Sequence, residues 1–363
     1  MSVAGQSVIT HAAALSWQAG VIPEFWSIVP HAGMIYARTA AGIVWWDDGE
    51  RQWRSVKKNP FDLYCMGLAA AAGSAEPIYA LEGRFLFVSY DGCRTWKRRA
   101  MPFEHVPGSQ TPVAADPRMP FTLYVFGQTL AATDPDWKTQ HGLYWSSNAG
   151  RTWDGPLLIG PVGPPLGPVR HGLIVLAPDP AFAMSGGIFM ATGHGLYQWS
   201  SMPVSGERAM PLFELPVSDK AAINAIAVGP RAKNPIAVAA HVDGDYHLKV
   251  SLDAGATWTI RDPYPHKFWI DDLLYVDDVL FAKLLHWDPA AGDKLAGAIL
   301  MSRDNGATWI DITAPDLVMP LTHQMSINWP REGLAATATH LYLMSRGMGT
   351  RSIALSDLRK VVG

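Results

Sequence analysis

Hydrophobic and polar positions form short runs along the whole chain, and turn-forming residues separate these runs. Examples are IYALE and RFLFVS within 78–89, and PIAVAAH and HLKVS within 235–251. Short apolar runs bounded by Gly, Pro and Asp are typical of β-strands. The 33 glycines and 28 prolines among 363 residues disfavour a helix-rich protein. The pattern therefore predicts an all-β fold.

One octapeptide recurs through the chain and sets the spacing of these runs. Its four clear copies are SYDGCRTW at 89–96, SSNAGRTW at 146–153, SLDAGATW at 251–258 and SRDNGATW at 302–309. Weaker matches occur at 46–53, 195–202 and 340–347. The equivalent positions 46, 89, 146, 200, 251, 302 and 345 are 43 to 57 residues apart. Repetition at such a period indicates a stacked or circular architecture.

Seven repeat units account for the chain, and each has room for four strands. Four short strands per unit predict one antiparallel sheet, and seven such sheets predict a seven-bladed β-propeller that forms a single domain over 1–363. The last unit is short of a strand, so we expect the amino-terminal segment 5–17 to complete the last sheet beside residues 340–357. That strand would close the ring.

The octapeptide has the composition of a hydrogen-bonded turn. Asp accepts backbone N–H groups of its own turn, Ser and Thr do so more weakly, and Gly adopts positive φ. We expect the final Trp to pack between sheets. Cys93 replaces the Gly, Asn148 replaces the Asp, and units four and seven lack a proper octapeptide, so we expect looser turns there. The expected structural residues are Ser89, Asp91, Trp96, Ser146, Asn148, Gly150, Trp153, Ser251, Asp253, Gly255, Trp258, Ser302, Asp304, Gly306 and Trp309.

This octapeptide resembles the S-x-D-x-G-x-T-W Asp-box of the BNR or Asp-box propeller superfamily. ADPRMPFTLYVFG at 115–127 and ATGHGLYQWS at 191–200 resemble strand motifs of its xyloglucan-active endoglucanases and photosystem II assembly factors. The superfamily also contains sialidases and the sortilin ectodomain. Sialidases carry an aromatic-Arg-Ile-Pro motif, whereas Arg118 here stands in Pro-Arg-Met-Pro with no aromatic before it. The resemblance implies the propeller fold and disfavours sialidase activity.

An endoglucanase-like reaction would need two carboxylates facing each other across a cleft. Candidate acids at the mouth of the central channel are Glu24, Asp62 and the pair Asp271–Asp272, of which Asp62 and Asp271 are the candidate catalytic residues. Trp26 and Trp269 are candidates to stack on sugar rings. The alternative is that these acids cap turns and these rings pack between sheets. Arg170 and His171 face the channel, or else lie at a solvated strand end.

The sequence predicts no metal site and no cofactor. The segment HVDGDYH at 241–247 reads as a hairpin turn flanked by two histidines. No recognised metal-ligand spacing accompanies it. No Gly-rich phosphate loop stands between a strand and a helix, and the net charge of −3 provides no general attraction for nucleic acid. With only two cysteines, Cys65 and Cys93, the chain is not a disulfide scaffold.

Positive charge is concentrated between Arg51 and Arg99. This stretch contains nine basic and four acidic residues, a local net charge of +5. On outer strands of adjacent units these cations would form a lateral patch for an acidic partner or lipid headgroups. The alternative is that they discourage edge pairing. The cations are Arg51, Arg54, Lys57, Lys58, Arg84, Arg94, Lys97, Arg98 and Arg99.

Two classes of function remain open from the sequence. The first is a non-catalytic interaction scaffold that presents loops to a protein or glycan, including as a subunit of a larger assembly such as a phage particle. The second is a glycoside hydrolase or carbohydrate-binding protein acting at the channel mouth.

The first Lys or Arg is Arg38, and no run of about 18 apolar residues occurs. We therefore expect no secretory signal, no membrane span, and a location in the cytoplasm or in an assembled particle.

Overall fold

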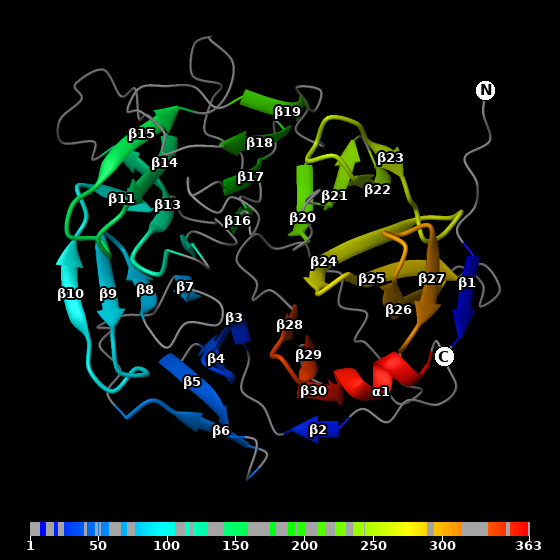
Figure 1. Cartoon of the computed structure of the whole chain (residues 1–363), viewed down its shortest axis with the longest axis horizontal. Coiled ribbons are helices and arrows are strands. Elements are labelled where there is room, and N and C mark those ends of the chain that lie inside the picture. Colours follow the sequence, from blue (N-terminus) through cyan, green and yellow to red (C-terminus); the bar gives the residue numbers. More distant parts are fainter. Residues whose placement is uncertain are drawn as a thin grey trace. The chain divides into compact units, whose positions relative to one another are not determined.

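The computed structural model is almost entirely β-structure (Figure 1). Its contacts divide the chain into two compact units. One unit comprises residues 26–219, and the other comprises residues 1–25 and 220–363. The structure describes residues 8–11, 18–20, 25–39, 42–47, 50, 52–57, 67–70, 77–105, 113–116, 119–129, 141–158, 175–178, 188–192, 195–199, 210–214, 222–229, 235–242, 244–288, 294–313, 333–345 and 349–361.

The unit of residues 26–219 contains four sheets. The first has β3 (Phe25–His31), β4 (Met34–Thr39), β5 (Gly42–Asp47) and β6 (Gln52–Ser55). The second has β7 (Gly67–Ala70), β8 (Ile78–Glu82), β9 (Phe85–Ser89) and β10 (Lys97–Ala100). The third has β11 (Phe103–His105), β12 (Val113–Ala115), β13 (Leu123–Thr129), β14 (His141–Ser146) and β15 (Asp154–Leu158). The fourth has β16 (Val175–Pro178), β17 (Ile188–Thr192), β18 (Gly195–Trp199) and β19 (Met210–Glu214).

The other unit contains three sheets and the terminal helix. The fifth sheet has β20 (Ala222–Val228), β21 (Ile236–Val242), β22 (Asp245–Ser251) and β23 (Thr259–Ile260). The sixth has β24 (Phe268–Val276), β25 (Val279–Asp288), β26 (Lys294–Ser302), β27 (Thr308–Asp311) and β1 (Val8–His11). The seventh has β28 (Leu334–Ala336), β29 (His340–Ser345), β30 (Gly349–Ala354) and β2 (Gln18–Gly20), and helix α1 (Leu355–Lys360) follows β30.

These sheets are the blades of a seven-bladed β-propeller, which confirms the fold predicted from the repeat. Within each unit the first strands of successive sheets contact one another: β12 lies against β7 and β16, and β24 lies against β20 and β28. The remaining strands follow across the sheets in chain order, except that β11 and β12 both pair with β13, and that β1 and β2 lie at the ends of the sixth and seventh sheets. An amino-terminal strand also contributes to the seventh sheet, as the short last unit predicts.

The position of that closing strand differs from the prediction. Residues 18–20, as β2, pair antiparallel with β30 and complete the seventh sheet. Within the predicted segment 5–17, the described residues 8–11 form β1, which pairs in parallel with β27 of the sixth sheet. The assignment of 5–17 to the last sheet is therefore wrong. Two outer strands, β27 and β30, each accept an amino-terminal strand at the open edge, whereas the prediction considered only one open edge.

The four octapeptides fold into the same hydrogen-bonded turn. The first residue, Ser, donates from Oγ to the side-chain oxygen of the third residue over 2.7–3.0 Å. That Ser Oγ also accepts the backbone N–H of the fifth residue over 2.6–2.8 Å. The third residue's Oδ1 accepts the backbone N–H of the seventh residue, Thr, over 2.8–2.9 Å. Each turn thus satisfies its backbone donors with its own side chains.

The turns with Cys93 and Asn148 are no looser than the others, so the expectation is wrong for these two, whereas the corresponding turns of units four and seven lie outside the described residues. Asn148 accepts the amides of Arg151 and Thr152 through Oδ1 over 3.0 and 2.9 Å, as an aspartate would. Its Nδ2 donates to Thr152 Oγ1 over 2.7 Å, whereas in the other three turns the Thr hydroxyl donates to the aspartate. Cys93 adopts φ of 66°, a left-handed conformation that costs a non-Gly residue energy, while its side chain is fully buried.

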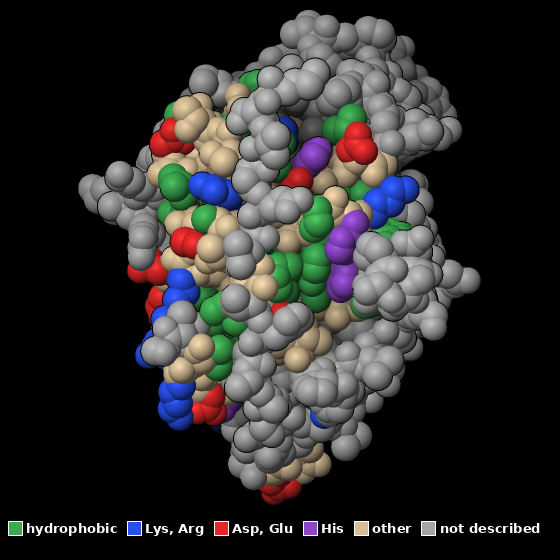
Figure 2. Space-filling model, turned by 90° about the vertical axis from the view of Figure 1, so that its right-hand side faces the viewer, with side chains coloured by type: hydrophobic (Ala, Val, Ile, Leu, Met, Phe, Trp, Pro, Cys, Tyr) green, Lys and Arg blue, Asp and Glu red, His purple; other side chains and the backbone are tan. Residues whose placement is uncertain are grey.

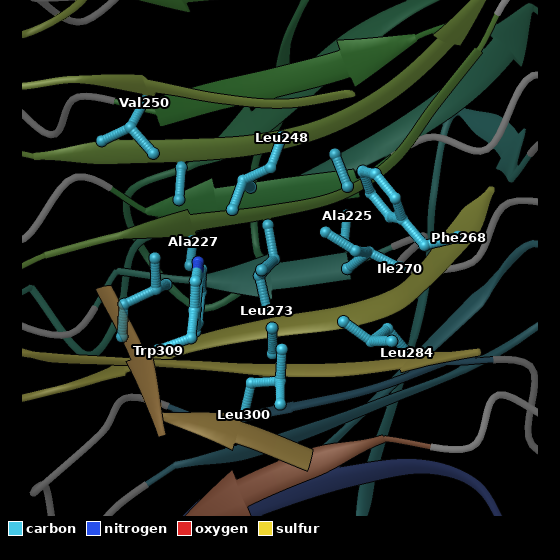
Figure 3. Packing of buried hydrophobic residues seen from close by; sticks show 14 of the residues in the cluster. Ala225, Ala227, Leu248, Val250, Phe268, Ile270, Leu273, Leu284, Leu300 and Trp309 are labelled. Atoms are coloured by element: carbon cyan, nitrogen blue, oxygen red, sulfur yellow. The ribbon is translucent and has the colours of Figure 1, made fainter. Parts of the chain in front are cut away.

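The Trp that ends each octapeptide packs beside its own turn. Trp309 is 0% exposed and lies in a cluster of the fifth and sixth sheets (Figure 3). Trp153 packs against the cluster of the second and third sheets, edge-on to Phe103 with ring centroids 5.0 Å apart. Trp96 packs against the cluster of the first and second sheets. The hydrophobic core is therefore divided into layers between neighbouring sheets.

Helix α1 covers the layer between the sixth and seventh sheets. Its Leu355 and Leu358 are buried against Phe281, Met301 and Ile353. At the exposed side of the helix, Arg359 reaches the carboxylate of Asp277 over 3.4 Å. The carboxyl-terminal segment is thus held to the sheets by apolar burial, because an exposed ion pair of this length contributes little.

We predict that acid weakens the turn at 251–258 through one carboxylate. Hydrogen bonds from Thr257 and Ser251 lower the pKa of Asp253 to about 2, from 3.8. Because the folded-state pKa is lowered, this stabilisation is present above about pH 4 and is lost as the pH falls towards 2. Chemical denaturation of wild type and Asp253→Asn between pH 5 and 2 measures the difference. The variant should show a smaller loss of stability, and Asn148→Asp should show a larger one; an unchanged pH dependence in both would contradict this.

Truncation of Trp309 should destabilise the fold far more than truncation of Trp258, the Trp of the preceding octapeptide. Trp309 is fully buried, so Trp309→Ala should cost about 3–5 kcal/mol in the free energy of unfolding. Trp258 is only partly buried and donates to Gly255 O over 3.0 Å, so Trp258→Ala should cost less. Equal losses in urea denaturation would show that the inter-sheet layer is not what Trp309 stabilises.

Candidate functional site

The nominated channel residues fall into two groups. Glu24, Asp62, Arg170 and His171 lie outside the described residues, as does the side chain of Trp26 in β3. Trp269 and Asp271 are described, and both belong to β24, the first strand of the sixth sheet. The site that can be built from the residues upward therefore lies in the unit that contains the fifth and sixth sheets.

Trp269 belongs to a group of three aromatic rings. Its ring centroid lies 5.4 Å from that of His241 and 5.1 Å from that of Tyr246. His241 and Tyr246 are 5.3 Å apart and are cross-strand partners at the end of the β21–β22 hairpin. All three side chains are partly exposed. The ring planes are tilted by 34–54° to one another, and the rings pack against each other. They therefore form a continuous aromatic surface and not an open cage around a ligand.

A second group of rings lies at the same end of the sixth sheet. Tyr264 stacks on His286 with centroids 4.2 Å apart and planes 15° apart. His266 Nε2 and His286 Nδ1 are 3.3 Å apart, so one imidazole N–H points at the other ring. These three side chains are also partly exposed. We call the six residues together the aromatic–histidine surface: His241, Tyr246, Tyr264, His266, Trp269 and His286.

Strand pairing brings these residues to one end of the two sheets. β24 begins at Phe268, which lies opposite His286 near the end of β25. The amide of Trp287 donates to Lys267 O over 3.0 Å and extends that pairing to the residue beside His266. In the fifth sheet the β21–β22 hairpin turns at the same level, with Val242 opposite Asp245. Figure 2 shows histidine side chains beside hydrophobic ones on this side of the molecule.

The segment before β24 is held by a carboxylate. Asp262 accepts His247 Nδ1 over 2.8 Å through one oxygen and the amide of Leu248 over 2.8 Å through the other. The predicted hairpin flanked by His241 and His247 therefore exists, but the two histidines have different surroundings. His247 pairs with Asp262, whereas His241 packs on Tyr246 and Trp269, and burial lowers the pKa of His241.

The candidate acids on β24 are engaged in the fold. Asp271 Oδ2 lies 2.8 Å from Nζ of Lys283, which is 0% exposed. Asp272 accepts the amides of Leu273 and Leu334 over 2.9 and 2.8 Å, which ties β24 to the start of β28. The strand is bulged between Ile270 and Asp272, so two acids stand where regular pairing has room for one. These carboxylates neutralise a buried lysine and cap backbone amides.

Among the described residues, the arrangement gathers aromatic and imidazole rings, and the two acids of β24 do not form an opposed pair. Within the described part of the chain, no three His, Cys, Asp or Glu side chains converge to hold a metal ion. No helix among the described residues is long and apolar enough to cross a membrane. Sequence reasoning found Trp269 but missed Tyr264, His266 and His286. The signal was the density of rings in YPHKFW at 264–269 and LHW at 285–287, which only strand register brings together.

No protein-family model matches the sequence, and no curated protein matches it. Solved structures match it as a fold. A GH74 enzyme from Niastella koreensis is 14% identical with a TM-score of 0.64, over 94% of this chain and 53% of that chain. YCF48 bound to D1 peptide is 13% identical with a TM-score of 0.58, over 95% and 98%. YCF48 from Cyanidioschyzon merolae is 15% identical with a TM-score of 0.58, over 95% and 99%.

The chain spans about half the length of the GH74 enzyme and nearly the whole length of the two YCF48 chains. At such low sequence identities these similarities show the fold alone, and function has to be argued from the side chains of this chain.

We predict that His241 titrates below the ordinary histidine value of 6.5, because burial disfavours its charged form. Since the unfolded chain binds this proton more readily, acidification from pH 6.5 to the lowered pKa should destabilise the fold. Trp269→Ala should uncover the ring and raise its pKa towards 6.5, as followed by NMR of the imidazole resonances. Tyr264→Ala, in the other group of rings, should leave it unchanged. A His241 pKa at or above 6.5 in the wild type would refute this.

Proposed function

We propose that this chain is a non-catalytic interaction propeller that binds a protein or glycan partner through the aromatic–histidine surface. The observation that carries this proposal is the gathering of six partly exposed aromatic and imidazole rings at one end of the fifth and sixth sheets. Tyr and Trp supply large contact areas with a polar group at the rim, and they are enriched at binding surfaces.

The rigidity of the strands supports this assignment. Tyr246, Trp269 and His286 stand on strands rather than on long loops, and Asp262 fixes the connection that carries Tyr264 and His266. Side chains that are already ordered lose little conformational entropy when a partner binds. The imidazole N–H groups add hydrogen-bond donors beside the rings.

The alternative, hydrolysis of a glycoside, has weaker support among the described residues. A hydrolase needs one carboxyl group to act as acid and another to act as base or nucleophile. Asp271 is paired with buried Lys283, and Asp272 accepts two backbone amides, so both acids of β24 have structural partners. The similar folds include both an enzyme and a protein bound to a peptide, so the fold by itself favours neither function.

The repeat supports the same assignment from the sequence. The octapeptide resembles the Asp-box, and we propose that the chain is an Asp-box propeller of one domain. In all four copies the side-chain oxygen of the third residue accepts a hydrogen bond within its own turn. If the repeated turns have a structural role, the residues that bind a partner lie elsewhere, at the strand ends. We propose that this scaffold acts within a larger assembly, in the cytoplasm or in a particle.

The two functions are separated by one set of assays on the same protein. A panel of chromogenic aryl glycosides should show no hydrolysis above background by wild type. A glycan array and hydrogen exchange in the presence of candidate protein partners should show binding that Trp269→Ala reduces at least tenfold. Trp53→Ala, which truncates a partly exposed Trp packed on Trp46 in the first sheet, is the matched control.

The outcomes are distinct. Turnover that is lost in Asp271→Asn would overturn the non-catalytic proposal and favour the hydrolase. Binding that Trp53→Ala and Trp269→Ala weaken equally would refute the aromatic–histidine surface as the binding site.

A further inference from the structure

The second and sixth sheets match strand for strand at their outer edges. In the sixth sheet Met301 and Leu300 of β26 lie opposite Ile310 and Asp311 of β27. In the second sheet, counting from the Ser of each octapeptide, the equivalent residues Val88 and Phe87 of β9 lie opposite Lys97 and Arg98 of β10. Strand β10 is therefore the counterpart of β27 in position and in register.

The outer edge of β27 already accepts an added strand. β1 (Val8–His11) pairs with it in parallel, with Ile9 opposite Trp309 and His11 opposite Asp311. Ile9 also packs on the hydrophobic cluster of the fifth and sixth sheets. The repeat therefore provides, within this chain, an example of an extended segment bound at the outer edge of a blade.

The equivalent edge of β10 is open among the described residues. Strand β10 is the end of its sheet, and Lys97, Arg98 and Ala100 are exposed. The amide of Met101 donates to Arg84 O over 2.9 Å, so by strand alternation the backbone groups of Arg98 and Ala100 point away from β9. Two other outer strands, β15 and β19, are less suitable because they contain Pro156 and Pro211, which lack an N–H.

The edge of β10 carries positive charge on both faces. Arg98 stacks on Phe85 with its guanidinium carbon 3.6 Å from the ring centroid, and Arg84 lies 5.5 Å from the same centroid. On the other face Lys97 lies 5.4 Å from the centroid of Tyr90, and Arg99 donates to Tyr90 Oη over 3.2 Å. Contacts with aromatic rings position Arg84, Lys97 and Arg98 but do not neutralise their charge, and Arg99 also donates to the backbone carbonyl groups of Asn148 and Ala149.

No described carboxylate forms an ion pair with Arg84, Arg94, Lys97 or Arg98. Asp91, the acid nearest in sequence, uses both oxygens for its own turn, accepting Ser89, Arg94 N and Thr95. Of the other cations in the predicted basic stretch, Arg54 pairs with Asp47 and Glu50, and Arg51 and Lys58 lie outside the described residues.

We propose that the outer edge of β10 binds an extended acidic polypeptide segment, which adds to the second sheet as a fifth strand, parallel to β10. The backbone of the segment would pair with the outward groups of Arg98 and Ala100. Successive side chains of a strand point to opposite faces, so acids at alternate positions would meet Arg84 and Arg98 on one face, and the residues between them would lie over Lys97 and Arg99. The same cations repel a second copy of this edge, so they discourage self-association and select an acidic partner.

The test uses a fluorescein-labelled eight-residue peptide of alternating Glu and Thr, titrated with the whole chain in 50 mM salt and followed by fluorescence anisotropy. We expect saturable binding that weakens as salt is raised, because exposed charges are screened. The peptide of alternating Lys and Thr should not bind. Arg98→Glu should weaken binding of the acidic peptide at least tenfold, and far-UV circular dichroism checks that the variant is folded.

A second peptide distinguishes strand addition from simple charge attraction. N-methylation of alternate residues keeps every carboxylate but removes the donors on one edge of the peptide backbone. Methylation on the edge that faces β10 should abolish binding, whereas methylation on the opposite edge should not. Ala100→Pro, which removes an outward donor from the protein, should also weaken binding at least tenfold.

Equal binding of both methylated peptides, or binding unchanged by Arg98→Glu, would overturn the proposal. Failure to bind the acidic peptide at all would do the same. This surface is independent of the aromatic–histidine surface, so Trp269→Ala should leave peptide binding unchanged. Either binding proposal can therefore fail without the other.

Discussion

The side-chain oxygen of the third residue in each repeated turn is the acceptor on which the packing of neighbouring sheets depends. It fixes the amide of the Thr that directly precedes the Trp. The Trp ring then packs on its own turn, as Trp153 and Trp309 do beside Gly150 and Gly306. Asn148 shows that the turn needs an oxygen acceptor, and that a negative charge is not required. The charge adds acid sensitivity to the turns that contain Asp.

Because the repeated turns hold the blades together, side chains at the strand ends are not needed for packing and can bind a partner. Because the turns, the Trp residues and the apolar layers hold the blades, the side chains at the start of β24 and at the β21–β22 hairpin need not contribute to the core. The aromatic–histidine surface occupies one such end, and the cationic outer edge of β10 is another open feature. The pair of buried Lys283 and partly exposed Asp271 links β24 to β25 and has a structural role in the sixth sheet.

The fold was predictable because its signal is repeated. Four clear octapeptides and three weaker matches, 43 to 57 residues apart, predicted the number of blades, and the composition of the octapeptide explains the hydrogen bonds of its turn. Single departures were harder to judge: Cys93 and Asn148 looked disruptive, yet each retains the N–H or oxygen that the turn uses. The closing strand was misplaced because a sequence gives no register between segments more than 300 residues apart, such as Gln18 and Ser352.

The candidate site was predictable only in part. Trp269 could be nominated because it lies near the candidate acids Asp271 and Asp272 in the sequence, but the contact of His266 with His286 depends on cross-strand register over 20 residues. Asp271 and Asp272 were candidates for glycoside hydrolysis because the sequence alone does not show which groups they bond. Lys283 stands within the apolar strand β25, and the partner of Asp272 is a backbone amide 62 residues away. Unpaired acids and structurally engaged acids look alike before the strands are aligned.

Amide hydrogen exchange at the seventh residue of each turn tests the central constraint most directly. The side chains of Thr95, Thr152, Thr257 and Thr308 are all exposed, yet each backbone N–H is bonded to a side-chain oxygen within its own turn. We predict slow exchange at all four amides, with Thr152 in the Asn-containing turn as protected as the others. Exchange at any of them as fast as in an unstructured peptide would contradict the claim that these turns are held by their own side chains.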